Sequence, residues 1–531
     1  MRTPEEDEYQ SDHQPGQDNV RLFGFELHNP VFFISAFLML VFVIGAALFP
    51  EAAQRALDGS KNWSIEYFDW LFMAAASVFV LFCLSLVVLP VGRIRLGGSD
   101  AVPEFSRLSW FAMLFAAGMG IGLMFWSVAE PVAYYTDWFG TPLGAEAGTD
   151  EGRRLAMGAT MYHWGLHPWA IYGLVALALA FFCFNKGMPL TIRAAFYPVL
   201  GERCWGWPGH VIDVVAVLAT VFGLATSLGL GARQAGGGLE YLLEIPNELN
   251  VQLGIIAGVT VVAIYSVLRG IHGGVKLLSN INMCLAALLL LFVVIAGPTL
   301  SILMMLGSTL GSYAENLVAL SSWAGREDES WFHGWTIFYW AWWISWSPFV
   351  GMFIARVSRG RTVREFVTAV LIVPTVITSV WLSAFGGSAL EQIRQGVGEL
   401  AADGLQDEAL AMFQMLDGLP LAEVTSLIAV ALVLIFFITS ADSGSLVVDS
   451  ITAGGKLDAP RGQRVFWAAM IGLIAGSLLF VGGEAALSAL QAGAITTGLP
   501  FTLVLLAMCF TLYRGLSQER RLLLAGDSPS P

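Results

Sequence analysis

The sequence is poor in charge and in cysteine, and each shortage removes classes of protein. Only 13% of its 531 residues are charged, whereas a soluble domain carries about 25%. The five cysteines are odd in number and scattered, without a disulfide framework or the paired spacing of a zinc site. We also find no basic tract that would bind phosphates and no nucleophile–base or metal-ligand constellation. We therefore expect neither an enzyme nor a nucleic-acid-binding protein.

Apolar residues, by contrast, make up 56% of the chain. They form repeated runs near 20 residues, long enough to cross about 30 Å of hydrocarbon. The sequence therefore predicts an all-α polytopic membrane protein with twelve transmembrane helices. We place them at about residues 31–50, 68–91, 107–128, 154–184, 210–239, 251–269, 276–305, 333–356, 363–386, 422–452, 463–481 and 485–513.

Positive charge gives the expected orientation. Lys and Arg gather in the loops after even-numbered spans and after the last span, as they do on the cytoplasmic side of membrane proteins. Both termini are therefore predicted to be cytoplasmic, with the protein in a bacterial-type inner membrane. The segments outside the spans are predicted to be a disordered acidic tail (1–29), an amphipathic helix on the outer surface (307–330), an acidic outer loop with some helical character (387–420) and a short cytoplasmic tail (514–531).

Two spans carry residues that interrupt helices. These are Gly118, Gly120 and Gly122 in "GMGIGLMFWSVAEP", and Ser347, Pro348 and Gly351 in the eighth span. Unwound backbone at membrane depth is tolerated only where it is buried or lines a cavity, and paired interruptions mark the midplane site of transporters. The alternative for the glycines is close packing against a neighbouring helix.

The third and eighth spans are five apart, which predicts two five-helix repeats. The first repeat would occupy residues 105–306 and the second residues 331–513, each opening with a discontinuous helix. Residues 30–92 would form two peripheral N-terminal helices before them.

Aromatic residues lie well inside two spans instead of at the membrane interfaces. They are Trp164, Trp169 and Tyr172 in the fourth span, and Trp342, Trp343 and Trp346 in the eighth. Aromatic faces attract quaternary ammonium groups, which have no N–H to donate. Ordinary helix packing is the alternative interpretation.

The tenth span contains "FFITSADSGS", in which Phe436, Thr439 and Ser440 share one helix face. Hydroxyls and freed carbonyls are hard oxygen ligands that suit a small cation such as Na⁺. The commoner fate of such hydroxyls in membrane helices is a hydrogen bond to the carbonyl one turn earlier.

Together, "GMGIGLMFW…AEP", "HWGLHPWAIY", "FYWAWWISWSPFVGMFIARVSRGRTVREF" and "FFITSADS" resemble the betaine–choline–carnitine transporter family. The resemblance covers about residues 20 to 515. It implies a LeuT-type core of two inverted repeats, and commonly a homotrimer.

The resemblance also implies site residues. The substrate's trimethylammonium group would lie among Trp164, Trp169, Tyr172 and Trp343, with Trp346 close by, and its carboxylate on the backbone of Gly118, Met119, Gly120 and Gly122. One Na⁺ would be held by the carbonyls of Ala116, Met119 and Phe436 and the hydroxyls of Thr439 and Ser440. A second Na⁺ site would involve Thr226 and Phe349.

Family differences narrow the substrate. Relatives that take up choline tend to have Asp at the position of Gly122, which here favours a zwitterion such as glycine betaine. Sodium-independent exchangers lack the glycine motif and the sodium ligands, both of which are present here. The chain does not carry the long basic C-terminal helix of some osmoregulated relatives, so osmotic activation and ordinary nutrient uptake are equally expected.

The remaining buried polar residues are expected to serve structure and gating. We assign His163 and His167 to packing or hydrogen bonding near the aromatic site, and Glu130 and Asp442 to gating or helix-cap networks. The cluster Arg356, Arg359, Arg361 and Arg364 anchors the cytoplasmic end of the eighth span, and part of it is expected to pair with Asp442 or other acidic groups in an inner gate.

The sequence thus predicts a secondary transporter that imports a quaternary-ammonium compatible solute, first of all glycine betaine, by Na⁺ symport with alternating access. The alternatives within this class are dimethylsulfoniopropionate, choline or carnitine as substrate, with H⁺ as the possible coupling ion. A channel or a membrane-bound sensor is the alternative of another class.

Overall fold

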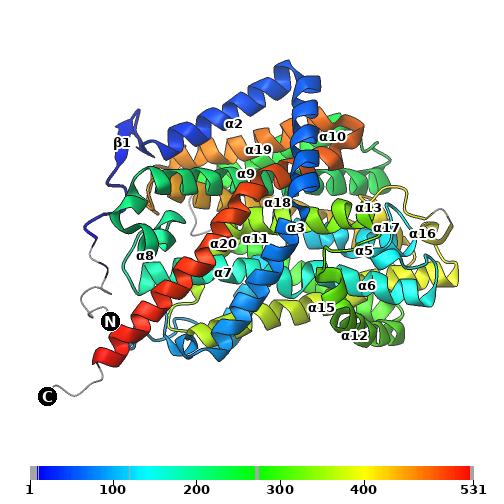
Figure 1. The fold of residues 1–531 in the computed structure, drawn as a ribbon. Coiled ribbons are helices and arrows are strands. Elements are labelled where there is room, and N and C mark those ends of the chain that lie inside the picture. The colour runs from blue at the N-terminus through cyan, green and yellow to red at the C-terminus, as the bar shows by residue number, and fades with distance from the viewer. Residues whose placement is uncertain (1–8, 10, 119, 270–273, 403, 527–531) are drawn as a thin grey trace.

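The computed structural model describes residue 9 and residues 11–118, 120–269, 274–402 and 404–526. These residues form an almost wholly helical protein with one short β-hairpin (Figure 1). The all-α fold class predicted from the sequence is confirmed in this respect.

Long helices make up most of the chain. In the first half they are α2 (Val31–Leu48), α3 (Pro50–Val88), α4 (Arg107–Gly118), α5 (Ile121–Tyr135), α6 (Asp150–Trp164), α7 (Leu166–Phe184) and α9 (Trp207–Leu243). In the second half they are α10 (Leu249–Arg269), α11 (Gly274–Ala296), α12 (Thr299–Ser321), α14 (Ile337–Val357), α15 (Val363–Gln395), α18 (Ala422–Thr452), α19 (Arg461–Gly482) and α20 (Ala486–Gly526).

Shorter elements connect these helices. The strands are β1 (Asn19–Leu22) and β2 (Phe25–His28), and the short α-helices are α8 (Tyr197–Leu200), α13 (Glu329–Trp331), α16 (Glu399–Ala402) and α17 (Ala411–Asp417). The remaining helical turns are η1 (Pro90–Arg93), η2 (Pro142–Gly144), η3 (Arg193–Phe196), η4 (Gly201–Trp205), η5 (Phe332–Thr336) and η6 (Gly483–Ala485).

The hairpin β1–β2 is held against the other end of the chain. The Asn19 side chain donates a hydrogen bond to the Ala453 carbonyl (2.9 Å), and the Glu26 N–H donates to the Gln463 side chain (3.1 Å). The disordered tail predicted for residues 1–29 is therefore wrong for the hairpin. Polar residues that look solvated in the sequence have partners just after α18 and in the first turn of α19.

The predicted interruption of the third span is present. Helix α4 ends at Gly118, α5 begins at Ile121, and the two are bent by 67°. Gly120, which precedes α5, has extended backbone with φ −154° and ψ −171°. Met119 lies outside the described residues.

The predicted interruption of the eighth span is wrong, because α14 continues through Pro348. A proline inside a helix leaves the carbonyl four residues earlier without its usual N–H donor. Here that carbonyl belongs to Ile344, and the Ser347 hydroxyl donates to it at 2.7 Å. The irregularity lies at the start of the span instead, where η5 forms a π-helical turn.

Several predicted bounds also need correction. The fourth span is divided at Gly165 into α6 and α7. The seventh ends at Ala296, ahead of Gly297 and Pro298, so that the outer helix predicted at 307–330 is α12, which begins at Thr299. The helical character predicted within 387–420 is present as α16 and α17, but the loop starts later than predicted, because α15 continues to Gln395. The predicted tail from residue 514 continues α20 as far as Gly526.

Nine helices in the described residues are long and apolar enough to cross a membrane, or ten if α4 and α5 count as one bent span. This count joins α19 to α20 and leaves out the aromatic-rich α14. A multi-pass membrane protein is therefore confirmed, whereas the number twelve and the inverted repeats stay predictions.

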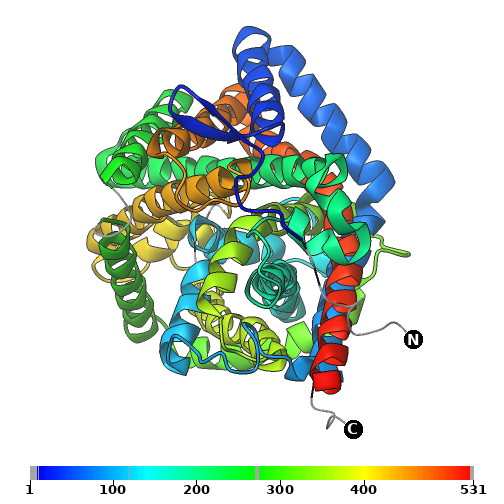
Figure 2. The same cartoon turned by 90° about the vertical axis from the view of Figure 1, so that its left-hand side faces the viewer.

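The helices surround a buried centre. Most residues of α7 and α9 are buried, whereas fewer than a third are buried in α2, in α10 and in the Leu277–Ala296 part of α11. Figure 2 looks along α7, which the other helices encircle. Helix α14 packs against α7, α9 and α20 in this centre. The hairpin, α8 and the C-terminal end of α20 lie at one end of the molecule, and α16 and α17 at the other (Figure 1).

Candidate substrate and ion site

Aromatic side chains from α6, α7 and α14 meet in the buried centre. Trp343 lies against Trp164 (ring centroids 5.0 Å apart, planes at 89°) and against Tyr172 (5.5 Å, 81°), and Trp169 lies against Tyr172 (5.7 Å, 84°). All four are buried. We call these four residues the aromatic cluster. The structure thus brings together the four residues around which the family resemblance places the substrate cation.

The N–H groups of two cluster indoles are already used within the protein. Trp164 Nε1 donates to Glu130 at 2.7 Å, and Trp343 Nε1 donates to the carbonyl of His163 at 3.0 Å. The buried hydroxyl of Tyr172 has no hydrogen-bond partner among the described residues. Ring faces and this hydroxyl are therefore the groups that the cluster can offer to a ligand.

Trp346, predicted to be close by, lines a separate cavity. Its indole donates to the carbonyl of Gly223 at 2.9 Å, and its ring meets Phe349 edge-on at 5.4 Å. The cavity has a volume of about 550 Å³ and lies between α4, α11, α14 and α18.

Four of the five residues predicted to hold Na⁺ line this same cavity. They are Ala116, Phe436, Thr439 and Ser440; the fifth, Met119, lies outside the described residues. The Thr439 hydroxyl donates to the Ile435 carbonyl at 2.9 Å, which is the alternative fate left open by the sequence. A donating hydroxyl keeps its oxygen lone pairs, so this bond leaves Thr439 able to ligate a cation.

The two residues predicted for the second Na⁺ site have different neighbours. Thr226 is buried on α9 and donates to the carbonyls of Phe222 (2.9 Å) and Leu490 (3.0 Å). Phe349 lines the cavity beside Trp346. Among the cavities described, none is therefore lined by both Thr226 and Phe349.

Gly122 touches the aromatic residues directly. A Cβ atom at this position would lie 2.3 Å from Cη2 of Trp342 and 3.1 Å from Cη2 of Trp164. A Cβ at Gly120 would lie 3.7 Å from Cη2 of Trp346, an ordinary contact distance. Both interpretations of the glycine motif therefore apply. The helix is interrupted there, and Gly122 also packs closely against aromatic rings.

The buried carboxylate of Glu130 lies next to the aromatic cluster, and the sequence did not indicate that it would contact a cluster residue. Glu130 Oε2 accepts from Trp164 Nε1 (2.7 Å) and the Tyr339 hydroxyl (2.6 Å), and Oε1 accepts from the Tyr134 hydroxyl (2.9 Å) and meets His163 Nδ1 at 2.7 Å. We call Glu130 with these partners the Glu130 network. It is no helix cap, because its partners come from three helices. The sequence offered one signal for this network, which was a carboxylate in an apolar span that also contains tyrosine and tryptophan.

The histidine pair has the structural role expected from the sequence. His163 belongs to the Glu130 network, and its Nε2 lies 3.0 Å from the Thr336 hydroxyl. His167 stacks on Trp340 with ring centroids 5.1 Å apart. No group of three or more metal-ligating side chains occurs in the part of the chain that the structure describes.

Of the acidic partners predicted for the arginine cluster, Asp442 is wrong, whereas another acidic group does pair with it. Asp442 pairs with Arg464 of α19 and accepts a hydrogen bond from Ser266 of α10 at 2.5 Å. Arg361, from the predicted cluster, pairs with Glu365 at 3.0 Å, one turn along its own segment. Asp442 therefore joins α18 to α10 and α19, at a sequence distance that no local pattern reveals.

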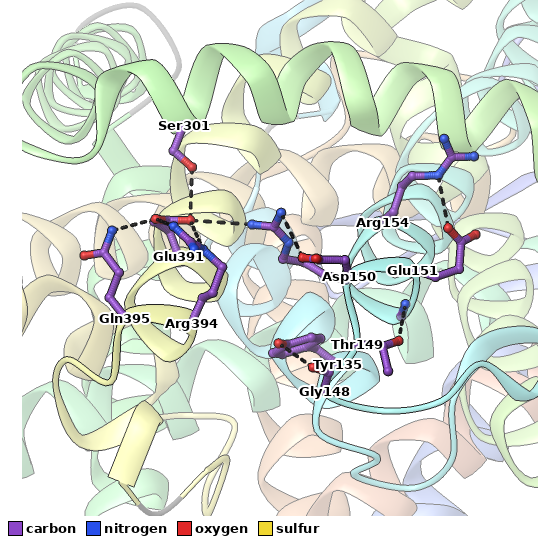
Figure 3. Close-up of polar contacts among 12 residues, drawn as sticks. Tyr135, Gly148, Thr149, Asp150, Glu151, Arg154, Ser301, Glu391, Arg394 and Gln395 are labelled. Atoms are coloured by element: carbon purple, nitrogen blue, oxygen red, sulfur yellow. Dashed lines mark hydrogen bonds and ion pairs between the residues drawn. The ribbon is translucent and has the colours of Figure 1, made fainter.

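A cavity of about 880 Å³ lies at the ends of α6, α12 and α15 and is rich in charge. At its wall the buried Glu391 pairs with Arg394 and accepts from the Ser301 hydroxyl at 3.2 Å, and Arg153 approaches it to 3.5 Å (Figure 3). These charges are satisfied by one another. At this cavity, charged side chains therefore hold the ends of three helices together, away from the aromatic cluster.

Fold and site together define a multi-pass helical membrane protein with a buried aromatic centre. The profile of the betaine/carnitine/choline family transporters matches residues 30–521. The chain therefore belongs to this transporter family, which confirms the resemblance seen in the sequence.

Individual relatives match over nearly their whole lengths. The chain is 62% identical over 512 residues, 96% of this chain and 98% of the relative, to glycine betaine transporter 1 of Vibrio parahaemolyticus. It is 58% identical over 510 residues (96% and 91%) to a glycine betaine/proline/choline/ectoine transporter of the same organism. It is 45% identical over 494 residues (92% and 95%) to the glycine betaine transporter OpuD of Bacillus subtilis. Family and relatives are transporters, so the prediction that the chain is not an enzyme is confirmed.

Proposed function

We propose that the protein imports glycine betaine by Na⁺ symport with alternating access. The aromatic cluster carries this proposal, because the faces of Trp164, Tyr172 and Trp343 meet at nearly right angles in a buried centre. A trimethylammonium group cannot donate a hydrogen bond, so ring faces are its natural partners, worth about 2 kcal/mol when desolvated. The names of the three relatives support the same class of solute.

A zwitterionic substrate is supported by the surroundings of Gly122. An acidic side chain there would counter the charge of a cation such as choline, but a Cβ would already collide with Trp342. We propose that the substrate carboxylate instead binds backbone at the interruption between α4 and α5, around Gly118, Met119, Gly120 and Gly122. Backbone N–H groups freed at a helix start are suited to bind an anion.

Sodium is proposed to bind through the carbonyls of Ala116, Met119 and Phe436 and the hydroxyls of Thr439 and Ser440. The shared cavity of the four described members supports this assignment. The second site at Thr226 and Phe349 has weaker support, because the Thr226 hydroxyl already donates to two carbonyls.

The wider scaffold is proposed from the family. It would have twelve transmembrane helices, inverted repeats at residues 105–306 and 331–513, cytoplasmic termini and a homotrimeric assembly. The breaks at α4/α5 and α6/α7 are where segments could move around the site. Dimethylsulfoniopropionate, choline or carnitine, with H⁺ coupling, remains the second candidate, since ring faces also attract a sulfonium cation.

The test is uptake of labelled glycine betaine into proteoliposomes that contain the purified protein. With an inward Na⁺ gradient we expect accumulation above the outside concentration, and with K⁺ in place of Na⁺ we expect none. Accumulation without Na⁺ would contradict the coupling ion. No uptake in either condition would contradict glycine betaine as substrate, and the second candidates would then be tested under a proton gradient.

A further inference from the structure

Glu130 is a fully buried carboxylate that contacts one member of the aromatic cluster directly. Four groups able to donate, two hydroxyls, an indole N–H and an imidazole nitrogen, surround its two oxygens at 2.6–2.9 Å. Such charge-assisted hydrogen bonds are short and strong. No Lys or Arg pairs with Glu130 in the described residues, so its charge is spread over these neutral donors and an imidazole.

The Glu130 network ties together the helices that form the cluster. Glu130 and Tyr134 lie on α5, His163 and Trp164 on α6, and Tyr339 on α14. The bond to Trp164 Nε1 fixes the plane of that indole, whose ring then meets Trp343 at 89°. The carboxylate thus holds one wall of the site relative to the other.

We propose that Glu130 is a positioning and specificity-determining residue, which orients Trp164 and whose negative charge strengthens the attraction of the cluster for a cationic head group. An indole N–H bonded to a carboxylate passes electron density into its ring, and a more electron-rich face attracts cations more strongly. The substrate class that gains is a quaternary ammonium or sulfonium zwitterion over an analogue of equal shape whose head group carries no charge. This inference rests on the proposed function.

The structure offers a substitution that removes the charge and keeps the shape. In Glu130→Gln the amide oxygen can accept from Trp164 and Tyr339, while its NH₂ group can donate to the Tyr134 hydroxyl, which in turn can donate to the unprotonated Nδ1 of His163, 3.2 Å away. Every donor of the present network can therefore keep a partner. Glu315→Gln is the matched control, because Glu315 pairs with Arg154 at an exposed position.

The test measures equilibrium binding to the purified full chain in Na⁺ by calorimetry, with two probes. One is glycine betaine, and the other is its carbon analogue, in which a neutral tert-butyl group replaces trimethylammonium. In Glu130→Gln we expect betaine affinity to fall about tenfold, while affinity for the carbon analogue stays within about twofold of wild type. Glu315→Gln should bind both probes as the wild type does.

Equal loss for both probes would mean that Glu130 only maintains shape, and no loss for either would mean that its charge is not felt; both outcomes overturn the inference. If Glu130→Gln does not fold, Trp164→Phe provides the second test, since it removes the N–H contact and should show the same selective loss. Equal loss for both probes in Trp164→Phe would overturn the inference. A wild type that binds neither probe would overturn the proposed function, and the inference with it.

Discussion

In the proposed site, individual residues bind the substrate through the faces of aromatic rings and bind Na⁺ through oxygen lone pairs. The indoles of Trp164 and Trp343 have their polar N–H groups bonded to Glu130 and to the backbone, so the groups they can still offer to a ligand are their apolar ring faces. Glycine betaine needs this combination, because its trimethylammonium group is charged yet cannot hydrogen-bond.

Trp343 is central to the cluster, since it contacts both Trp164 and Tyr172. We predict that Trp343→Leu weakens glycine betaine binding about five- to thirtyfold, because it removes about 1–2 kcal/mol of cation–π attraction. Binding to purified protein, with the melting temperature as a folding control, checks this. Wild-type affinity in a folded Trp343→Leu variant would remove Trp343 from the site.

Thr439 and Ser440 contribute the side-chain oxygens of the proposed Na⁺ site. Replacing both with Ala removes two of five proposed ligands, so we predict a rise of roughly tenfold or more in the Na⁺ concentration for half-maximal uptake. Betaine affinity at saturating Na⁺ should change far less. An unchanged Na⁺ dependence would show that the ion binds elsewhere.

That the four cluster residues lie together could be predicted at this scale, but the Glu130 network could not. The cluster residues stand in motifs that identify the family. Glu130 accepts from Tyr339, which is 209 positions away in sequence, and a single sequence contains no signal for a contact at that distance. The Asp442–Arg464 pair was missed for the same reason.

The arrangement of the helices determines how closely the residues of the site approach one another. The indoles of Trp342 on α14 and Trp164 on α6 can lie close to α5 because Gly122 has no side chain in their way. The sequence indicated the break before α5 correctly, since several glycines weaken a helix whatever surrounds them. It misjudged α14, because the rule for proline does not anticipate the Ser347 hydroxyl that donates to the Ile344 carbonyl.

We predict that Gly122→Ala destabilises the protein by about 1–3 kcal/mol and weakens betaine binding, since overpacking shifts the indoles of Trp342 and Trp164. Gly120→Ala is the matched control, because its Cβ would make an ordinary contact with Trp346. Melting temperature and binding report the two effects. Equal behaviour of the two variants would mean that close packing at Gly122 does not position the cluster.

Whole-molecule organisation includes a contact that the sequence did not predict. The hairpin β1–β2 packs near the start of α9 through His28, whose Nε2 accepts from Arg193 at 3.0 Å. Burial and the charge of Arg193 lower the pKa of His28 from 6.5 to about 3, with His210 and His13 acting in the same direction. Asp18, 3.8 Å away, is the nearby acidic group.

Docking of the hairpin should therefore weaken in acid. A released hairpin would bind a proton near pH 6.5 that the docked one cannot, so docking free energy is lost as pH falls from 6.5 toward about 3. At about pH 5.5 the loss is about 1.4 kcal/mol, a roughly tenfold increase in opening. Hydrogen exchange of the β1–β2 amides, corrected for intrinsic rates, measures it. His28→Gln keeps an acceptor without a titrating group and should lose this pH dependence; a wild type whose opening ignores pH would contradict the account.

The most direct test of the central claim is an experimental structure of the protein with glycine betaine and Na⁺ bound. The account predicts density for the trimethylammonium group between the faces of Trp164, Tyr172 and Trp343, with the carboxylate toward the break between α4 and α5. Betaine bound elsewhere, for example in the charged cavity at the ends of α6, α12 and α15, with the aromatic cluster packed on itself, would contradict it.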